Sequence, residues 1–486
     1  MTAQTAIKTP QENPKRTIAI LHRIKRTASG EARPTLLRIT PDQGGGSGVD
    51  LKLETEQNEL DFILGRYPVR MRKAGAADTI PDHPEHQLTF SEYDPEKHGI
   101  VPDHHKVVRG KKTFILTEVP DVLEGLKESD KVLMPLGGSG DYLAFAASVQ
   151  AEKVGAVVLR IPPRQIKEER DRLQSVGPLD NFDNLEILPR LHRNNPDYFY
   201  PVTIRERDMI QARELFRARE HTQRDRKSCA MRVRQLAIGE IFVKADGLFP
   251  QGSIEKQFDE IQGDDGILKL IAKREKELEA DLGKVLPRIP VYEKVFGPIE
   301  GVGPVIAAGI ICAVGDIRLF VRSGGNLRHR AGKLKKFCGV APENGKLPRK
   351  TTGKSLGFNP QVRQALFKFG DQMNKRPGSE WGMRLAENKA HYVKKFPFET
   401  LVVKPSEEYA GEYLIDGEVC RKLGTRYEIK VMGEWHRVAG KRKHFKGHLH
   451  KMAIWKTLTE FVEHLYDEWT RLEGIIPGQG EAQAAA

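Results

Sequence analysis

An α/β domain followed by an all-α region is the fold class that the sequence predicts, and three observations carry this prediction. The chain has 486 residues, too many for one ordinary core, so two or three domains are expected. Between residues 86 and 203, short apolar runs alternate with helical patterns, which is typical of a partly parallel sheet covered by helices. After residue 204, long proline-free stretches with helical spacing predict helices.

Composition narrows the class of protein and of partner. There are 79 Lys and Arg against 66 Asp and Glu, a net charge of +13, and such an excess attracts polyanions such as nucleic acids. The longest nearly pure apolar run, residues 305–314, is far shorter than the roughly 20 residues of a membrane-spanning helix, so a membrane protein is excluded. The 4 cysteines lie far apart without a CxxC pair, and no secretory signal is visible, so a cytoplasmic protein is expected.

Changes in composition divide the chain into segments. Residues 1–85 contain the linker-like run GGGSG and no long periodic stretch, so an irregular extension is expected there. Within the α/β segment, strands are predicted at 113–116, 131–134 and 154–161, and helices at 119–126 and 141–153. The expected segments are 1–85 (irregular N-terminal extension), 86–203 (α/β domain), 204–290 (Arg-rich helix and coiled coil), 291–470 (C-terminal domain with an insertion near 396–445) and 471–486 (disordered tail).

The Arg-rich stretch that opens the helical region has two interpretations. From Arg205 to Arg234 there are 10 Lys and Arg against 5 Asp and Glu, which predicts a long exposed helix with a basic face. This face would bind nucleic acid or a partner helix, whereas the alternative is a solvated helix with many ion pairs. The candidate nucleic-acid contacts on it are Arg213, Arg217 and Arg224.

A second helix is predicted at residues 267–286. Its apolar residues follow the spacing of a heptad seam and are interrupted once, at Glu275. About two to three heptads suggest a short coiled coil, and hence a homo-oligomer, either a dimer or a tetramer. The residues of the seam are Leu268, Ile271, Leu278, Leu282, Val285 and Ile289.

The segment 299–317 has the pattern of a helix-hairpin-helix, a hydrophobic-Gly-hydrophobic-Gly turn followed by an apolar helix. Gly301, Val302 and Gly303 would leave backbone N–H groups at a helix N-terminus free to bind a phosphate without reading the base sequence. The alternative is a plain turn before a core helix.

The next stretch, residues 318–354, is dense in Lys and Arg, and Glu343 is its single acidic residue. It is also rich in Gly, Pro, Asn and Thr, so it is expected to be loop-like. One-sided charge of this kind predicts phosphate contacts. The candidate residues are Lys333, Lys335, Lys336, Arg349 and Lys350.

Two weaker patterns concern metal ions. Asp180 and Asp183 lie three residues apart, so one helical face could present both to a divalent ion, although capping or surface solvation is the commoner origin of such a pair. His444, His448 and His450 have a spacing that zinc could use. Because no Cys or carboxylate nearby completes that set, a basic loop and helix start are favoured.

The order of several stretches resembles that of a known family. The stretches are Val132-Leu-Met-Pro-Leu-Gly-Gly-Ser, Val157-Val-Leu-Arg-Ile-Pro-Pro-Arg-Gln-Ile-Lys, the acids of Leu179-Asp-Asn-Phe-Asp, an Arg-rich helix at 213–236, the segments 299–320, 338–342 and 357–367, and a closing helix at 447–469. In this order they resemble the DEDD-type insertion-sequence transposases, the serine-using, bridge-RNA-guided group related to the pilin-gene invertase Piv. The resemblance covers about residues 86–470.

The resemblance implies a fold for each half of the chain. Residues 86–203 would form an RNase H-like domain, as in Holliday-junction resolvases. Residues 291–470 would form the transposase domain that contains the helix-hairpin-helix. The implied partners are DNA and a guide RNA.

The resemblance also implies an active site in which four acids bind a divalent metal such as Mg²⁺ and a serine forms a covalent ester with the cut strand. Asp180 and Asp183 match the last two acids and Asp94 matches the first, whereas Pro135 stands at the remaining position, with Asp141 nearby. No serine is present at 343–354, so the stand-in nucleophiles are Thr351 and Thr352.

Two functions therefore stay open at the level of sequence. The first is a transposase or site-specific recombinase of a mobile element, which cleaves and transfers DNA strands. The alternative is a catalytically inactive descendant that binds DNA or RNA through the Arg-rich helix, the hairpin and the basic stretch.

Overall fold

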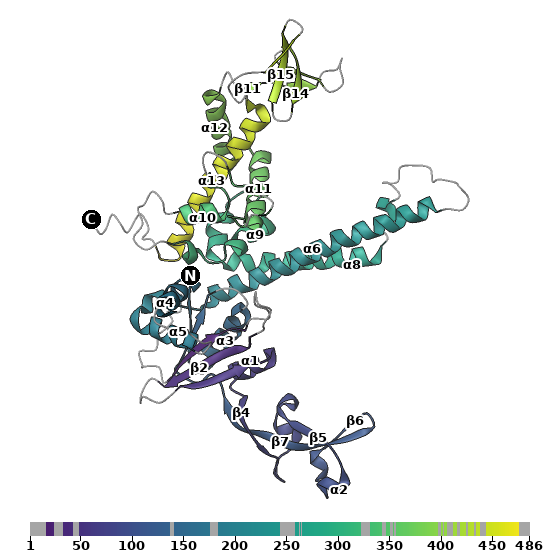
Figure 1. Ribbon diagram of the computed structural model, residues 1–486, viewed down its shortest axis with the longest axis vertical. Coiled ribbons are helices and arrows are strands. Elements are labelled where there is room, and N and C mark those ends of the chain that lie inside the picture. Colours follow the sequence, from purple (N-terminus) through teal and green to yellow (C-terminus); the bar gives the residue numbers. More distant parts are fainter. Residues whose placement is uncertain are drawn as a thin grey trace. The chain divides into compact units, whose positions relative to one another are not determined.

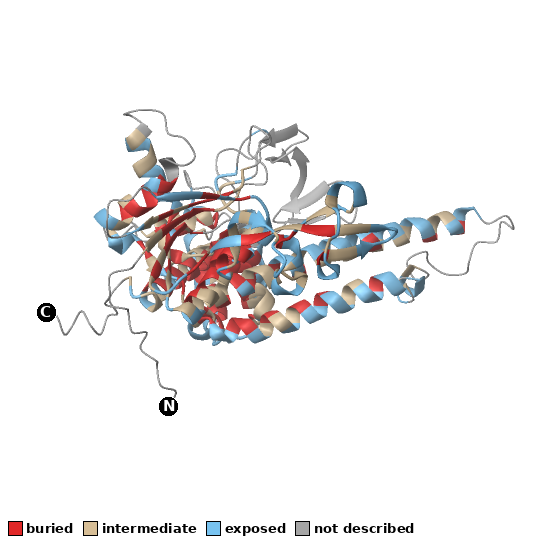
Figure 2. Ribbon diagram, turned by 90° about the horizontal axis from the view of Figure 1, so that it is seen from below, coloured by how far each residue is buried: buried red, intermediate tan, exposed pale blue. Residues whose placement is uncertain are grey.

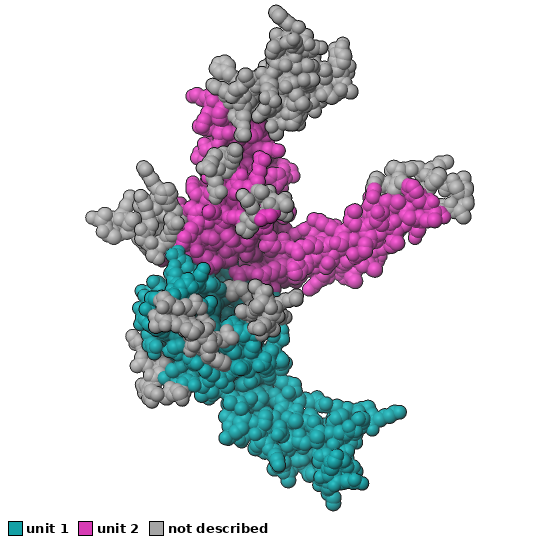
Figure 3. All heavy atoms as spheres, in the orientation of Figure 1, with its two compact units in different colours: residues 1–210 teal, residues 211–486 magenta. Residues whose placement is uncertain are grey.

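A computed structural model describes most of the chain as two units, residues 1–210 and residues 211–486 (Figure 1 and Figure 3). The division falls inside a single long helix, and each unit has its own core. The described residues are 16–23, 33–41, 48–136, 140–174, 183–243, 258–261, 263, 265–321, 331–342, 347–349, 353, 356–396 and 444–475, together with six short strands between 400 and 437. The predicted α/β region followed by helices is confirmed at this level.

The first unit is built on a six-stranded mixed sheet with the order β10-β9-β8-β1-β2-β3. Strands β1, β2 and β3 are antiparallel neighbours, β8 runs parallel to β1, β9 runs parallel to β8, and β10 is antiparallel to β9. Their bounds are β1 Arg16–Leu21, β2 Thr35–Pro41, β3 Val49–Leu53, β8 Asp130–Pro135, β9 Val157–Ile161 and β10 Tyr200–Pro201.

The expectation that residues 1–85 form an irregular extension is therefore wrong, because this segment supplies half of the central sheet. Its strands have only 5 to 7 residues each, and linker-like composition lies between them. β1 finds its parallel partner β8 more than 100 residues later, since Arg16 is paired in register with Asp130. A pairing of such range leaves no local signal in the sequence.

Helices cover both faces of this sheet, which explains why its strands are buried on both sides. Ile18 and Ile20 of β1 point to one face, in a core with α1 (Glu56–Ile63) and α3 (Asp141–Val154). Ala19 and Leu21 point to the other face, in a core with residues of α4 and α5. The bounds of these two helices are α4 Pro163–Gln174 and α5 Asp183–Asn194. The burial colours of Figure 2 show the same layer of buried strands.

Residues 67–124 form a second, antiparallel sheet with the order β4-β7-β5, and β6 also pairs with β7. The predicted strand at 113–116 lies in β7, but the predicted helix at 119–126 is wrong, since β7 continues as far as Glu124. Pairing with β4 keeps this stretch extended, and Val119 belongs to a small core with Leu88 and Leu116. The bounds are β4 Tyr67–Lys73, β5 Thr89–Glu92, β6 Lys106–Arg109 and β7 Lys112–Glu124.

The second unit is mostly helical. The two helices expected between 204 and 290 are confirmed as α6 (Ile204–Phe242) and α8 (Gly266–Val285), which run side by side as a long pair (Figure 1). In the described part of this unit, five more α-helices follow, and the aromatic rings of Phe369, Trp381 and Phe461 pack together between three of them. These helices are α9 Pro304–Val314, α10 Gly332–Phe337, α11 Pro360–Lys375, α12 Glu380–Lys395 and α13 Lys446–Leu472.

Within the insertion expected near 396–445, the described residues after Phe396 form β-strands. Five of them, β12 to β16, form an antiparallel meander, and β11 pairs with β17 in parallel. The bounds are β11 Thr400–Leu401, β12 Val403–Pro405, β13 Glu412–Ile415, β14 Glu418–Leu423, β15 Arg426–Val431, β16 Glu434–Arg437 and β17 His444–Phe445. Across the described residues, no helix is long and apolar enough to cross a membrane.

Candidate functional site

The carboxyl ends of the parallel strands β1 and β8 meet at one edge of the central sheet, and from there the chain turns to opposite sides. β1 continues into His22 and returns through β2, whereas β8 continues past Pro135 toward α3. Ligands of α/β proteins bind in the crevice at such a reversal of strand order. A pocket of about 460 Å³ lies here, and its polar lining consists of His22, Arg23, Glu56, Glu59 and Tyr142.

His22 faces a buried carboxylate in this pocket. Its Nε2 lies 3.4 Å from Oε1 of Glu59, and the Thr35 hydroxyl donates to the same oxygen at 2.5 Å. Arg23 donates to the other oxygen of Glu59 at 3.2 Å. Burial by itself would raise the pKa of Glu59, but the hydrogen bonds from His22 and Thr35 and the charge of Arg23 bring it below its ordinary value. An ionised carboxylate that orients an imidazole is an arrangement suited to general acid–base chemistry.

Beside this pocket, the position that the resemblance assigns to a metal-binding acid holds no usable carboxylate. Pro135 stands there, and its carbonyl accepts a hydrogen bond from Arg160. The nearby Asp141, at the start of α3, is itself bound to Arg160 at 2.8 Å, and both side chains are almost fully buried. Because Arg160 already neutralises Asp141, this carboxylate is a poor ligand for a divalent cation.

The other predicted acids are not brought to this edge in the described part of the chain. Asp94 follows strand β5 of the second sheet and is the N-cap of the short helix α2 (Pro95–His98), where it accepts a hydrogen bond from the Glu96 N–H. Asp183 begins α5 and is described by its backbone alone, whereas Asp180 lies outside the described residues.

The remaining catalytic predictions are likewise not tested by the geometry. Thr351 and Thr352 lie outside the described residues. Among the residues that are described, no group of three or more His, Cys, Asp and Glu side chains could hold a metal ion. His450 is half-buried in α13, and burial followed by the charge of Lys389 lowers its pKa. The described residues thus do not assemble a Mg²⁺ site, and the acidic metal site stays a prediction.

The Arg-rich helix α6 has two faces with different roles. One face carries ion pairs, as the alternative interpretation predicted, and the other exposes its cations, as a binding face would. Residues three or four apart lie on the same face of a helix. On the inner face, Arg219 and Arg226 bind Glu275 of α8, and Arg219 also binds Glu279. Gln223 donates to Glu275 as well. Glu275, which interrupts the predicted heptad seam, is therefore a buried carboxylate that accepts hydrogen bonds from the inner face of α6.

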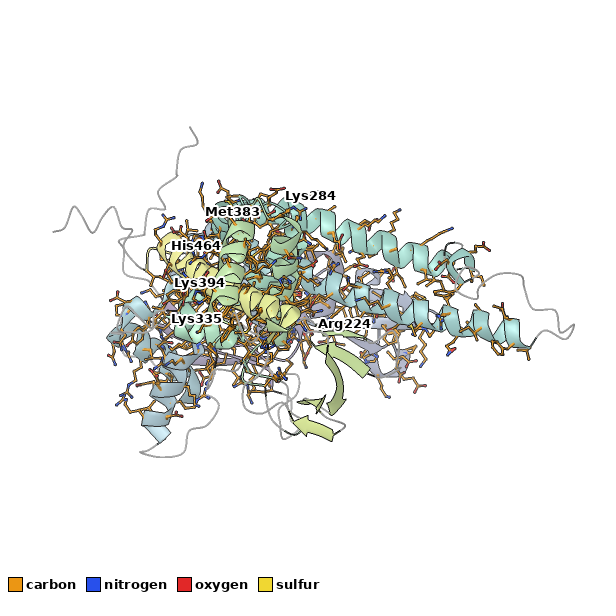
Figure 4. The ribbon with its side chains drawn as sticks, turned by 90° about the horizontal axis from the view of Figure 1, so that it is seen from above. Arg224, Lys284, Lys335, Met383, Lys394 and His464 are labelled. Carbon is orange, nitrogen blue, oxygen red and sulfur yellow. The ribbon has the colours of Figure 1, made fainter. Side chains whose placement is uncertain are left out.

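The outer face of α6 leaves its cations at the surface. Arg217 and Arg224, seven residues apart, lie on the side opposite to Arg219. Their side chains are 50% and 65% exposed, and their nearest carboxylates, Glu214 and Glu220, belong to α6 itself. Arg224 is labelled in Figure 4. Such exposed pairs within one helix contribute little to stability, so these guanidinium groups are available to a partner.

The third Arg predicted on this helix has an internal role. Arg213 is half-buried, and its guanidinium lies so close to Gly315, the C-cap of α9, that a Cβ there would be 3.2 Å from it. A cation at a helix C-terminus is favourable because the last carbonyl groups carry partial negative charge. Arg213 is thus expected to position α9 rather than to contact a ligand.

The glycines of the predicted hairpin have different surroundings. Gly301 has φ +82°, and a Cβ on it would lie 2.4 Å from the guanidinium of Arg376. Gly303 is the N-cap of α9 and has open space around it, while Val302 between them is buried. The turn is preceded by a π-helical segment, Tyr292–Phe296. The arrangement is compatible with a phosphate-binding turn, and the helix-hairpin-helix stays a prediction.

The basic stretch is partly used inside the unit. Lys335 of α10 binds Glu463 of α13 at 2.5 Å, and Lys333 donates to the Val321 carbonyl. Lys336 and Arg349 are exposed, whereas Lys350 lies outside the described residues. Two of the predicted contacts therefore link elements of the fold, and Figure 4 marks Lys335 among them.

The two units differ strongly in net charge. Residues 1–210 hold 30 Lys and Arg against 31 Asp and Glu, a net charge of −1, and residues 211–486 hold 49 against 35, a net charge of +14. The whole excess of the protein therefore belongs to the second unit. A polyanion would be attracted to that unit and not to the first.

No protein-family model matches this chain, and a comparison with curated proteins likewise finds no match.

Sequence reasoning missed the His22 pocket. The signal that could have found it is the apolar run Ile18–Leu21 followed directly by His22 and Arg23, which is the pattern of a buried strand with polar residues at its end. Glu59 and Thr35 had no local signal, because only strand pairing and the packing of α1 bring them to His22.

Proposed function

We propose that this protein is a transposase- or recombinase-like nucleic-acid-binding protein whose residues 211–486 hold the nucleic acid, with DNA as the main partner. The observation that carries the proposal is the charge division, −1 against +14. Exposed cations such as Arg217 and Arg224 supply candidate phosphate contacts in the positive unit. Phosphate contacts dominate the affinity of such proteins and make it dependent on salt.

The proposal includes an RNase H-like fold for the first unit, wider than the expected range 86–203. Support comes from the strand order, in which an antiparallel meander (β3-β2-β1) is continued by two strands parallel to β1. Helices on both faces and a pocket at the carboxyl edge are compatible with that fold. A guide RNA, a dimer or tetramer, and a cytoplasmic location belong to the proposal through the resemblance and the sequence.

A specific observation favours the catalytically inactive alternative. Arg160 is bonded to both Asp141 and the carbonyl of Pro135, so neither of these two described positions offers a free carboxylate for the metal acid that the resemblance requires. We therefore propose binding without metal-dependent strand cleavage. The protein would retain the architecture of a recombinase while holding nucleic acid for another purpose or for a partner enzyme.

Binding is tested with a fluorescein-labelled duplex of about 30 base pairs and fluorescence anisotropy between 50 and 200 mM salt. Each lost phosphate contact should reduce the slope of log K against log salt by about 0.9. The double variant Arg217→Gln/Arg224→Gln should bind several times more weakly, with a slope lower by up to about 1.8. The matched control is Arg70→Gln/Lys112→Gln, which removes two exposed, ion-paired cations of the first unit. Equal losses in both double variants would contradict the assignment to the second unit.

Cleavage is tested with supercoiled plasmid, Mg²⁺ and co-purified RNA. We expect no nicking by the wild type under conditions in which it binds the plasmid. Nicking that disappears in Asp180→Ala and in Asp183→Ala would instead establish a working acidic site and overturn the inactive reading.

A further inference from the structure

The antiparallel helices α12 and α13 bring aromatic rings and lysines together at one end of their pair. α12 packs along α13, with Trp381 near His464 and Asn388 bonded to Thr457. The last turn of α12 therefore lies beside the first turns of α13 (Figure 1). We call this region the α12–α13 end face and define it as Lys389, Tyr392, Lys394, Lys395 and Phe396 of α12 and its C-cap, with Lys451 and Lys456 of α13.

Two aromatic rings of this end face are parallel. The planes of Tyr392 and Phe396 differ by only 6°, and their centroids are 6.3 Å apart. Both residues are half-buried, so each is partly accessible to solvent. Positions four apart on a helix place these rings on one side, where a base that stacks on one ring is parallel to the other.

Lysines accompany both rings. The ammonium group of Lys395 lies 5.6 Å from the centroid of Phe396, and that of Lys456 lies 5.9 Å from the centroid of Tyr392. Lys394, labelled in Figure 4, and Lys451 are exposed. Among the described residues, no carboxylate forms an ion pair with any lysine of the end face, and Lys389 bonds to the neutral Asn374.

Two described acids close to the end face are already engaged. Glu387 and Glu460 both bind Arg384, which lies two turns earlier on α12. The end face thus keeps its positive charge, and the lowered pKa of His450, caused by burial and then by the charge of Lys389, follows from the same surroundings.

We propose that the α12–α13 end face binds an unpaired stretch of nucleic acid, with bases stacked on Tyr392 and Phe396 and phosphates held by the lysines. Stacking on aromatic side chains needs bases that are not paired, because the faces of paired bases are covered by their neighbours in the duplex. This inference rests on the proposed function and adds to it a preference for single strands at one place. The shared chemistry of single-stranded DNA and RNA suits the site equally.

The test compares a dT20 oligonucleotide, an rU20 oligonucleotide and a blunt 20-base-pair duplex by anisotropy on the full chain. Tyr392→Leu/Phe396→Leu keeps apolar bulk and removes the aromatic faces. We expect affinity for both single strands to fall about tenfold or more, and affinity for the duplex to change less than twofold. Tyr392→Phe keeps both rings and should bind as the wild type does.

The matched control is Phe367→Leu on the neighbouring helix α11, since Phe367 is 56% exposed and lies outside the end face. It should leave the affinity for every ligand unchanged. A single 2-aminopurine in the oligonucleotide gives an independent readout, because stacking quenches its fluorescence. Quenching by the wild type should be lost in the double Leu variant.

The outcomes separate the two proposals. Binding of the duplex together with single-strand affinity and quenching that do not change in the double Leu variant would overturn this inference and leave the proposed function intact. Failure of the wild type to bind any of the three ligands would overturn both. A preference for dT20 over rU20, or the reverse, with loss in the variant would support stacking and identify the strand.

Discussion

Residues 1–210 and residues 211–486 use their positive charge in different ways. In the first unit, two arginines neutralise buried acids: Arg16 binds Asp130, whose side chain is fully buried, and Arg160 binds Asp141. In the second unit, Arg224 and Lys394 stand at the surface, while the interior holds clustered aromatic rings and buried thiols. The comparison teaches that net charge indicates function only when the cations that are paired inside the fold are not counted as binding residues.

The inner face of α6 shows that arginines of the second unit also neutralise buried acids. Arg219 and Arg226 surround Glu275. Burial alone would raise the pKa of Glu275, but the hydrogen bond from Arg226 and the charges of both arginines bring it below its ordinary value. The same helix therefore carries arginines that pair with buried acids of α8 on one side and exposed arginines that could bind a partner on the other. The sequence count of 10 cations in this stretch does not distinguish them.

The largest effect is expected from breaking a buried pair of the first unit. Arg160→Leu leaves the carboxylate of Asp141 buried without its partner, and we expect a loss of about 3–5 kcal/mol in the free energy of unfolding. Urea titration followed by circular dichroism measures it. The double variant Arg160→Leu/Asp141→Leu removes both charges and should recover much of the loss. A double variant as unstable as the single one would show that packing, and not charge, holds this site together.

A smaller effect is expected at Glu59. Thr35→Val removes a hydrogen bond to a charged acceptor and should destabilise the protein by roughly 1.5–3 kcal/mol at pH 7. The folded-state pKa of Glu59 is lowered, so its contribution is present above the unfolded value of 4.5 and is lost as pH falls through the folded value. The difference between Thr35→Val and the wild type should therefore shrink below pH 4.5. Unfolding curves at pH 7, 5 and 3.5 check this, and a difference that is constant with pH would exclude the carboxylate as its cause.

In the second unit, substitutions of the two hairpin glycines should differ in their effect on stability. Gly301→Ala places a Cβ at positive φ and against Arg376, so we expect a cost of about 1–2 kcal/mol. Gly303→Ser should change stability by less than about 0.5 kcal/mol, because the position is open and serine is a good N-cap. Thermal unfolding compares the pair. If the turn binds phosphate through its backbone, duplex affinity should also fall in Gly301→Ala and persist in Gly303→Ser.

The smallest effect, almost none, is expected when thiol reagents meet the folded protein. Burial raises the pKa of Cys312 to about 12 and raises that of Cys338 as well, so very little thiolate is present at pH 8. Maleimide should not modify either residue until urea is added, as peptide mass spectrometry would show. Rapid labelling without urea would mean that the interior of the second unit opens readily.

Local patterns predicted several elements well. The strand at 131–134, the helix at 141–153 and the long helices after 204 appear where apolar spacing and the absence of proline indicated them. The pattern at 119–126 was ambiguous, since short apolar runs occur in both helices and strands. In the fold, pairing of β7 with β4 makes this stretch a strand. The strands before residue 54 were missed because each has only 5 to 7 residues and because β1 joins the rest of the sheet through β8, more than 100 residues later.

For the candidate sites too, some features follow from local sequence and others only from tertiary contacts. Sequence alone determined the excess of positive charge, the Arg-rich helix and the glycines of the hairpin, because composition and short spacing are local properties. Only the tertiary structure decided that Asp141 is neutralised by Arg160, that His22 meets Glu59, and that Tyr392 and Phe396 lie beside α13. Each of these contacts joins residues from different elements. Their proximity depends on strand pairing and helix packing, which minimise buried unpaired charge and exposed apolar surface over the whole chain at once.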